Sequence, residues 1–300
     1  MNPIRAFFVV TGLVASAAFA RDWIELEAMP THRSELSTAA LDGRIFLPGG
    51  LGGLTVFEVF DPRKNEWHKL PPLPEGRHHH STVAHAGKIF VFAGADSSWR
   101  PTATAWSFDP ATNDWRTLRP LPEPRYAGAA VSLGSYIYFV GGDGPSAASF
   151  RYNPKSDTWS LLAPPAERRE HTAAAVSDGK IYLIGGRWRS IGAMNTVEIF
   201  DPAADHWSPG PSLNEARSGH GVALVNNRIF ALGGEVLSSP RKTLDSVEVL
   251  DGNQWQWAGK LPLALHGVPA VGWNDSLYVL GGSERAGAIV NHGRVFMRRE

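Results

Sequence analysis

The chain of 300 residues contains no cysteine, and only 19% of its residues are charged. The absence of cysteine excludes disulfides, thiolate catalysis and cysteine metal ligands. Because 29 basic residues balance 29 acidic ones, we expect no binding of nucleic acid. The chain has instead 31 glycines, 22 prolines and 11 tryptophans, a composition typical of an all-β protein with many tight turns.

An apolar run lies at the start of the chain. Arg5 precedes it, and the small residues of Ala18-Phe19-Ala20 end it just before Arg21. This is the layout of a cleaved secretory signal, and the run is short for a membrane span. We therefore expect residues 1–20 to be removed, which predicts a periplasmic or secreted protein with no membrane attachment after cleavage.

A short pattern occurs six times along the rest of the chain. Its clearest form is IYLIGG at residues 181–186, which ends in a glycine pair. The first residue of each such pair falls at position 49, 93 (an alanine), 141, 185, 233 or 281, so the spacing is 44 or 48 residues. That period suits one four-stranded β-blade per repeat.

Other features keep step with the glycine pairs. A two-residue turn suited to a hairpin precedes each pair. A strand that ends in Asp or Asn follows, and six residues later comes a tryptophan: Trp67, Trp115, Trp159, Trp207 or Trp257. These features resemble the Kelch repeat. The resemblance implies an all-β fold, a six-bladed Kelch-type β-propeller of four-stranded antiparallel blades around a central channel.

The resemblance covers nearly all of residues 21–300, which we expect to form a single domain. The expected repeats are residues 34–70, 78–118, 126–162, 170–210, 218–260 and 267–300. Trp23 precedes Gly49 by 26 residues, the interval found between a tryptophan and the next glycine pair elsewhere in the chain. A closing strand near residues 22–30 is therefore expected to complete the last blade, which leaves no open edge there.

Ten residues after each of five tryptophans stands an arginine. A residue repeated in nearly every blade usually serves the scaffold, although one or two of these guanidinium groups could face an anionic ligand. The arginines are Arg33, Arg77, Arg125, Arg169 and Arg217.

Residues that break the repeat are better candidates for a ligand site, because a site for one small molecule is asymmetric. They lie in loops after the glycine pairs and before the first strands, which a propeller places on one face around the channel mouth. Trp99 and Trp188 suit either a sugar platform or a buried loop anchor. The predicted ligand-binding residues are Arg187, Trp188, Asn195, Arg217, His220, Arg169, Trp99, Asp96 and His266.

Titratable residues near the first strands also include Glu35, His79 and His80. If the mouth carries out proton transfer, the predicted catalytic residues are Glu235 and His171, either of which could be the base while an arginine holds the substrate carboxylate. No metal or other cofactor is expected. Residues 77–80 read RHHH, but alternate strand residues point to opposite faces, so His78 and His80 should not share a centre with His79.

Two functions are open from these residues. The first is an exported, monomeric propeller that binds a carbohydrate or a protein partner at its loop face. The second rests on a resemblance to the bacterial secreted Kelch epimerases that interconvert sialic acid anomers. That resemblance would imply a metal-independent sugar mutarotase or epimerase, so whether the chain is an enzyme stays open.

A resemblance to galactose oxidase would imply copper and a cysteine-crosslinked tyrosine, which the lack of cysteine excludes. A resemblance to eukaryotic Kelch adaptors implies arginines that bind acidic peptides.

Overall fold

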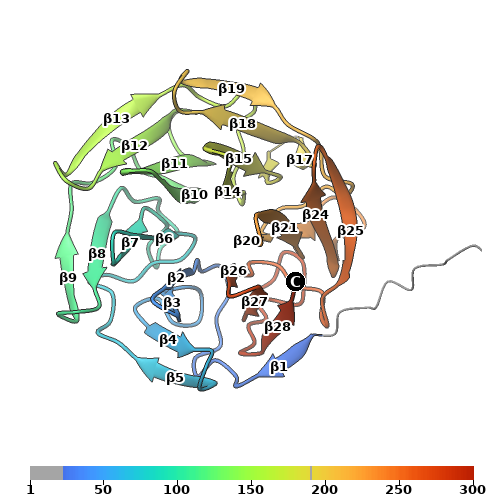
Figure 1. Ribbon diagram of the computed structural model, residues 1–300, viewed down its shortest axis with the longest axis horizontal. Coiled ribbons are helices and arrows are strands. Elements are labelled where there is room, and N and C mark those ends of the chain that lie inside the picture. Colours follow the sequence, from blue (N-terminus) through green and yellow to red (C-terminus); the bar gives the residue numbers. More distant parts are fainter. Residues whose placement is uncertain (1–22, 190) are drawn as a thin grey trace, which may run out of the picture.

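The computed structural model describes residues 23–189 and 191–300, and these form six sheets of four antiparallel strands around a central channel (Figure 1). The expected six-bladed β-propeller is confirmed. The described residues contain no helix that is long and apolar enough to cross a membrane. The predicted signal at residues 1–20 lies outside the described residues.

Each blade is an up-and-down sheet whose first strand lines the channel. Blade 1 consists of β2 (Ala39–Leu41), β3 (Arg44–Pro48), β4 (Phe57–Asp61) and β5 (Glu66–Lys69). Blade 2 consists of β6 (Ser81–His85), β7 (Lys88–Phe92), β8 (Ala105–Asp109) and β9 (Asp114–Thr117). Blade 3 consists of β10 (Tyr126–Leu133), β11 (Tyr136–Asp143), β12 (Ser149–Asn153) and β13 (Thr158–Leu162).

The second half of the ring repeats this order. Blade 4 consists of β14 (Ala173–Ser177), β15 (Lys180–Ile184), β18 (Val197–Asp201) and β19 (His206–Pro209). Blade 5 consists of β20 (Gly221–Val225), β21 (Arg228–Leu232), β24 (Ser246–Asp251) and β25 (Gln254–Lys260). Blade 6 consists of β26 (Ala270–Trp273), β27 (Ser276–Leu280), β28 (Val295–Arg299) and β1 (Ile24–Leu26).

The ring closes through β1, as the tryptophan spacing predicts. Ile24 pairs with Met297 and Leu26 with Val295, so a strand from the start of the described chain is the outer strand of blade 6. The indole of Trp23 donates to the carbonyl of Lys260 over 2.7 Å, which also ties this strand to blade 5.

The same indole contact occurs at the outer strand of each other blade. Trp115, for example, donates to the carbonyl of Pro71 in the preceding blade over 3.0 Å. In blade 5 this role belongs to Trp255, which bonds the carbonyl of Pro211 and is buried. The repeat position assigned to Trp257 from the sequence is therefore wrong, and the Trp257 side chain is exposed. Only two residues separate the paired residues Asp251 and Gln254 in the β24–β25 turn, against four between Asp61 and Glu66 in blade 1, so the structural tryptophan comes two residues earlier.

The hydrophobic core lies between blades. Each of six buried clusters combines residues of two neighbouring sheets. Phe57 of blade 1 and Phe108 of blade 2, for example, meet edge to face with their ring centres 4.9 Å apart. Since every blade buries both faces against its neighbours, the ring positions the loops rigidly around the channel.

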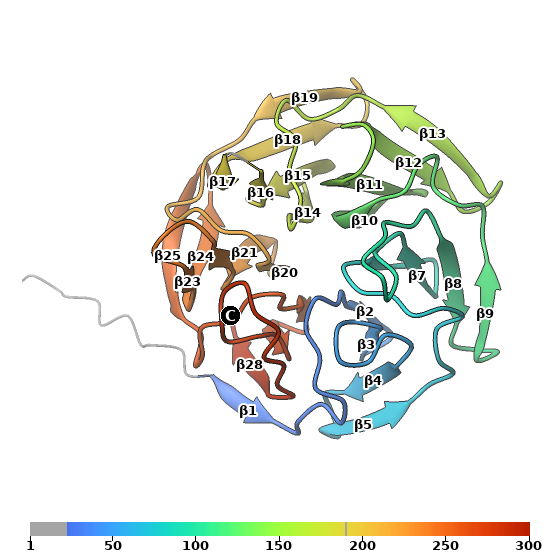
Figure 2. The same ribbon diagram turned by 180° about the vertical axis from the view of Figure 1, so that it is seen from behind.

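Two small hairpins extend from the loops between second and third strands. They are β16 (Arg187–Trp188) with β17 (Gly192–Ala193) in blade 4, and β22 (Glu235–Val236) with β23 (Lys242–Thr243) in blade 5. Figure 2 shows β16 close to β15, β17 close to β18, and β23 close to β24. We call the side of the ring that carries these hairpins the loop face.

Candidate functional site

A belt of six residues, one from each blade, surrounds the channel where the chain enters each inner strand. All six adopt a left-handed backbone, with φ between 49° and 58°. Five backbone hydrogen bonds join neighbours around the belt, such as the one from the amide of His79 to the carbonyl of Glu35 over 2.8 Å. The members of this axial belt are Glu35, His79, Ala127, His171, Gly219 and Gly267.

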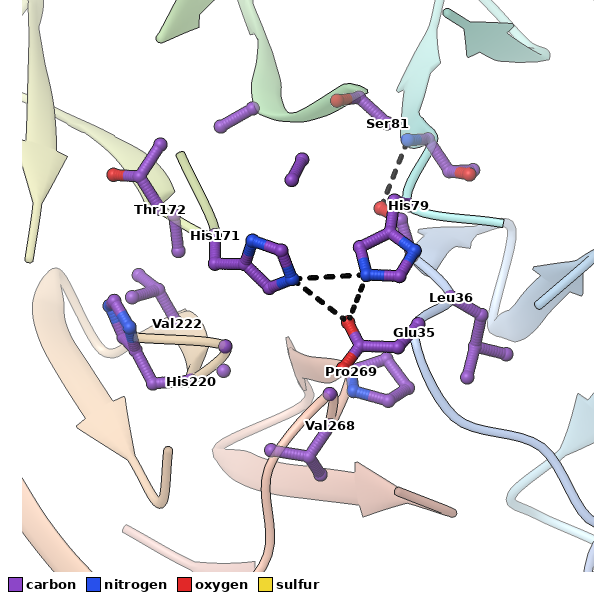
Figure 3. Close-up of a pocket in the computed structure, with 18 of the residues that line it drawn as sticks. Glu35, Leu36, His79, Ser81, His171, Thr172, His220, Val222, Val268 and Pro269 are labelled. Atoms are coloured by element: carbon purple, nitrogen blue, oxygen red, sulfur yellow. Dashed lines mark hydrogen bonds and ion pairs between the residues drawn. The ribbon is translucent and has the colours of Figure 1, made fainter. Parts of the chain in front are cut away.

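Three members of the axial belt bring titratable side chains together on the axis. The Nε2 atoms of His79 and His171 lie 3.0 Å apart. The Oε2 atom of Glu35 lies 3.2 Å from His79 Nε2 and 4.0 Å from His171 Nε2 (Figure 3). The small members make room for them: a Cβ on Gly267 would lie 2.5 Å from Glu35 Oε1.

Four further charged or titratable side chains surround this group. Arg187 is central, because its Nε bonds Glu170 over 2.7 Å and its NH1 bonds Glu235 over 2.6 Å. Its NH2 lies 3.0 Å from His171 Nε2. The Nδ1 atom of His266 lies 3.4 Å from a carboxylate oxygen of both Glu35 and Glu235. We call the seven residues the mouth cluster: Glu35, His79, Glu170, His171, Arg187, Glu235 and His266.

Burial and neighbouring charges set the protonation of this cluster. Burial lowers the pKa of His79 to about 4, despite the opposing effect of Glu35. Burial, followed by the charge of Arg187, holds the pKa of His171 well below its ordinary value. Burial would lower the pKa of His266, but Glu35 and Glu235 raise it above the ordinary value. Burial would raise the pKa of Glu35, yet His79 and His266 hold it low. The cluster therefore favours neutral imidazoles beside ionised Glu35, with His266 as the most basic histidine.

A cavity of about 180 Å³ lies beneath the mouth cluster, inside the ring. Glu35, His79 and His171 reach into it from the axial belt, and its walls are small residues at the start of the inner strands, such as Ala129 and Gly221. The cavity therefore combines a polar end with a narrow, small-residue wall.

The structure brings four of the predicted site residues together. Glu235 and His171, the predicted catalytic residues, lie in the mouth cluster with Arg187 and His266. Glu235 is 2% exposed and also accepts a hydrogen bond from the amide of Gly287. Trp99 stands beside the cluster, with its ring 5.4 Å from that of His79.

Other predicted residues lie apart from the cluster. Asp96 binds the amides of Ser98 and Arg100 in its own loop. Trp188 lies against the guanidinium groups of Arg168 and Arg189, at 4.5 and 4.8 Å.

Asn195 is exposed and donates to the carbonyl of Leu213 over 3.2 Å. His220 is buried and lines the cavity.

Arg169 and Arg217 have scaffold contacts. Both are 0% exposed, and each donates to carbonyls of its own blade, as Arg217 does to Gly233 over 2.6 Å. Each also pairs with a buried glutamate on the third strand, Glu198 or Glu248. This matches the scaffold interpretation of the repeated arginines.

His78 and His79 do not point to opposite faces, so that expectation from the sequence is wrong. Strand β6 begins at Ser81, and His79 has a φ of 54°, so residues 78–80 do not alternate as a strand does. The Nδ1 atoms of His78 and His79 lie 2.5 Å apart. Glu170 is a site residue that was not predicted, although its place between Arg169 and His171 in the repeat could have indicated it.

Residues 53–283 match the family model described as the Attractin/LZTR1 beta-propeller. The chain belongs to this family. As an Attractin/LZTR1-type propeller it carries Kelch repeats and is similar to Kelch-like protein 40a of Danio rerio, with 34% identity over 85 residues. It is also similar to Kelch-like protein 7 of Rattus norvegicus, with 31% identity over 98 residues, and to Kelch-like protein 34 of Homo sapiens, with 37% identity over 94 residues.

These matches cover 28%, 32% and 30% of this propeller and 14%, 16% and 14% of the relatives, so the chain spans a small part of their length. A solved structure titled "Structure of YjhT" superposes with a TM-score of 0.79 at 16% identity, over 90% of this chain and 96% of that one. At that identity the likeness shows the fold alone.

Proposed function

We propose that the chain is a binding propeller whose loop face holds an acidic segment of a protein partner. The observation that carries this proposal is a rim of exposed apolar side chains around the channel mouth. Trp99, Ile191 and Ile289 are 53%, 59% and 56% exposed on the loops between second and third strands of blades 2, 4 and 6. Exposed apolar groups that share one face are typical of a protein interaction site.

The charges on the same loops favour an acidic partner. Besides Arg294, which pairs with Glu25, four arginines are exposed there, whereas Glu284 is the exposed acidic residue among the described residues of these loops. Arg100 and Arg189 flank the apolar rim at Trp99 and Ile191. Guanidinium groups form paired hydrogen bonds with carboxylates, so they would orient an acidic segment around an apolar anchor. The arginines are Arg100, Arg189, Arg241 and Arg285.

The geometry favours binding over proton transfer at the mouth. A general acid or base must reach the substrate, but Glu235 and His171 are buried and bonded inside the mouth cluster. Anomer exchange of a sialic-acid-like sugar stays a prediction of the sequence. NMR of N-acetylneuraminate with the full chain tests it, since an enzyme must accelerate the exchange.

Peptide binding tests the main proposal. The full chain is screened against immobilised peptides in which Asp and Glu flank one Leu or Phe, and against the same peptides with Asn and Gln. We expect selective binding of the acidic set, weakened at least tenfold by Trp99→Ala or Arg189→Ala. Leu224→Ala is the matched control, because Leu224 is an exposed apolar residue in β20, close to the β20–β21 turn at the opposite face.

Equal binding of acidic and neutral peptides, or full binding by both loop variants, would contradict this assignment. A glycan array provides the other arm. Glycan binding that depends on Trp99 would assign the same rim to a carbohydrate instead.

Export is a separate proposal, supported by the signal-like composition of residues 1–20. Cell fractionation of the full chain, with mass spectrometry of its N-terminus, tests it. We expect a mature chain that begins at Arg21 outside the cytoplasm, and recovery of uncleaved chain in the cytoplasm would refute export.

A further inference from the structure

Hydrogen-bond partners fix which nitrogen of each axial histidine carries a proton. Nε2 of His78 lies 3.1 Å from the carbonyl oxygen of Asp96, which can only accept, so this nitrogen donates. In neutral His78 the Nδ1 atom then accepts from Nδ1–H of His79, 2.5 Å away. That arrangement leaves a lone pair on Nε2 of His79.

The second histidine is oriented in the same way. Nδ1 of His171 contacts the carboxylate of Glu170, which can only accept, so Nδ1–H donates a hydrogen bond to it. A neutral His171 therefore also presents a lone pair on Nε2. The two Nε2 lone pairs and the Oε2 atom of Glu35 consequently face one another as three acceptors (Figure 3).

The spacing of these three acceptors fits a metal ion. The edges of the triangle are 3.0, 3.2 and 4.0 Å. The point in its plane equidistant from all three atoms lies about 2.0 Å from each, which is the bond length of zinc to imidazole nitrogen and carboxylate oxygen.

The charge of the mouth cluster also calls for a cation. The carboxylates of Glu35, Glu170 and Glu235 face one guanidinium, that of Arg187, and His266, so one negative charge is uncompensated when His266 is protonated and two when it is neutral. The carboxylate side chains are only 12%, 12% and 3% exposed. Buried charge of one sign is costly unless it is neutralised, and one divalent ion supplies two positive charges.

We propose that Glu35, His79 and His171 bind a divalent transition-metal ion such as Zn²⁺ on the propeller axis. Two imidazoles and one carboxylate are a ligand set that such ions prefer. His78 and Glu170 hold the second nitrogen of each imidazole, as the outer partners of metal-binding histidines usually do. The cavity beneath the cluster leaves room for water as a further ligand.

Arg187 would compete with the metal ion for Nε2 of His171. Its NH2 group, 3.0 Å from His171 Nε2, donates to the lone pair that the metal would use. Binding of the ion therefore requires NH2 to leave that nitrogen, while the bonds of Nε and NH1 to Glu170 and Glu235 can remain. This proposal does not depend on what binds the loop rim.

Zn²⁺ titration tests the site. The full chain, purified without a histidine tag and treated with chelator, is titrated with Zn²⁺ by calorimetry and with Co²⁺ by visible absorption. We expect one ion per chain, and at least tenfold weaker binding in Glu35→Gln and His171→Gln. Glu170→Gln should weaken binding 10 to 100-fold without removing a ligand, an order-of-magnitude expectation for an outer partner.

His85→Gln is the matched control, because His85 lies at the far end of β6 and bonds Ser132 outside the cluster. Circular dichroism in chelator checks that each variant folds. X-ray absorption of the unmutated Zn²⁺ complex gives a readout that needs no variant, and we expect two imidazoles and oxygen ligands. Binding equal in wild type and both ligand variants, a spectrum without imidazole, or no saturable binding would overturn the proposal.

Discussion

The repeated arginines differ in the side chain that each meets on the third strand of its own blade. In blades 1, 4 and 5 the partner is a buried glutamate, as in the 2.6 Å pair of Arg217 with Glu248. In blades 2 and 3 it is an aromatic ring, with Arg77 5.0 Å from the ring centre of Trp106. Blade 6 has leucine and phenylalanine in the two places, Leu265 and Phe296, which share one core cluster. The two positions therefore form one packing unit, which is filled by an arginine–glutamate pair, an arginine–aromatic pair or a leucine–phenylalanine pair.

This packing unit predicts that substitutions of Arg217 and Glu248 in blade 5 have strongly non-additive effects on the free energy of unfolding. Arg217→Leu leaves the buried carboxylate of Glu248 without its cationic partner and should lower the free energy of unfolding by about 3–5 kcal/mol. Glu248→Phe leaves the guanidinium of Arg217 without its anionic partner and should have a similar cost. The double variant recreates the Leu265 and Phe296 pair, so it should lose clearly less than the sum of the two. Urea unfolding in a double-mutant cycle measures this.

The exposed variant Arg100→Ala is the control, with an expected change within about 0.5 kcal/mol. Additive losses in the cycle would show that the two positions act separately.

His220 predicts a pH dependence of stability. Burial, followed by the charge of Arg217, lowers its pKa in the folded chain to about 3. Unfolding restores an ordinary value of about 6.5, so the unfolded chain takes up a proton that the folded chain does not. The stabilisation is complete above about pH 6.5 and is lost as the pH falls toward 3.

The slope of the free energy of unfolding against pH measures this effect. Between pH 6 and 4, His220→Gln should reduce the fall in the free energy of unfolding by up to about 1.4 kcal/mol per pH unit relative to wild type. Urea unfolding at several pH values measures the slopes, with the exposed His206→Gln as control. Parallel slopes for wild type and His220→Gln would contradict a buried neutral imidazole.

At the scale of elements, strand β1 decides how the ring is held together. It pairs with β28, and Arg294 on the approach to β28 forms two hydrogen bonds of 2.7 Å with Glu25. Met29, just beyond the strand, is almost fully buried in the cluster between blades 6 and 1. Without β1, an edge of β28 would be exposed and this cluster would be incomplete.

Deletion of residues 23–29 should therefore lower the melting temperature by more than 5 °C in a thermal scan. The expected size follows from the loss of several buried and hydrogen-bonded groups, each worth about 1 kcal/mol or more. Glu25→Ala, which removes only the exposed pair with Arg294, should change the midpoint by about 2 °C or less. An unchanged midpoint after deletion would refute the closure of the ring by β1.

Much of this element scale could be predicted from the sequence. Glycine pairs, hairpin turns and tryptophan spacing are local chemistry repeated in register, so the six blades and the closing strand followed directly. The errors lie where local backbone departs from the repeat. The shorter turn between β24 and β25 gives the structural position to Trp255, and the left-handed backbone at His79 ends the alternation assumed for residues 78–80.

At the scale of the whole molecule, the candidate site is the point where the repeat loses its symmetry. The axial belt has the same left-handed backbone in all six blades, but its members carry a carboxylate, an imidazole, a methyl group or no side chain. Glu35, His79 and His171 come from blades 1, 2 and 4, and Arg187 reaches them from the small hairpin of blade 4. Their convergence depends on the closed ring, which brings positions 136 residues apart, the difference between 171 and 35, within 4.0 Å on one axis.

The sequence alone determined the fold of this protein, because the spacing of turns, glycines and tryptophans is a property of neighbouring residues. It also identified Glu235, His171, Arg187 and His266 as residues of one mouth. Only the tertiary structure decided which side chains meet, since distances across the axis depend on ring closure and on the rotation of each belt residue. The scaffold arginines are fully buried and paired inside their blades, whereas the guanidinium of Arg187 is partly exposed and shared by the mouth cluster.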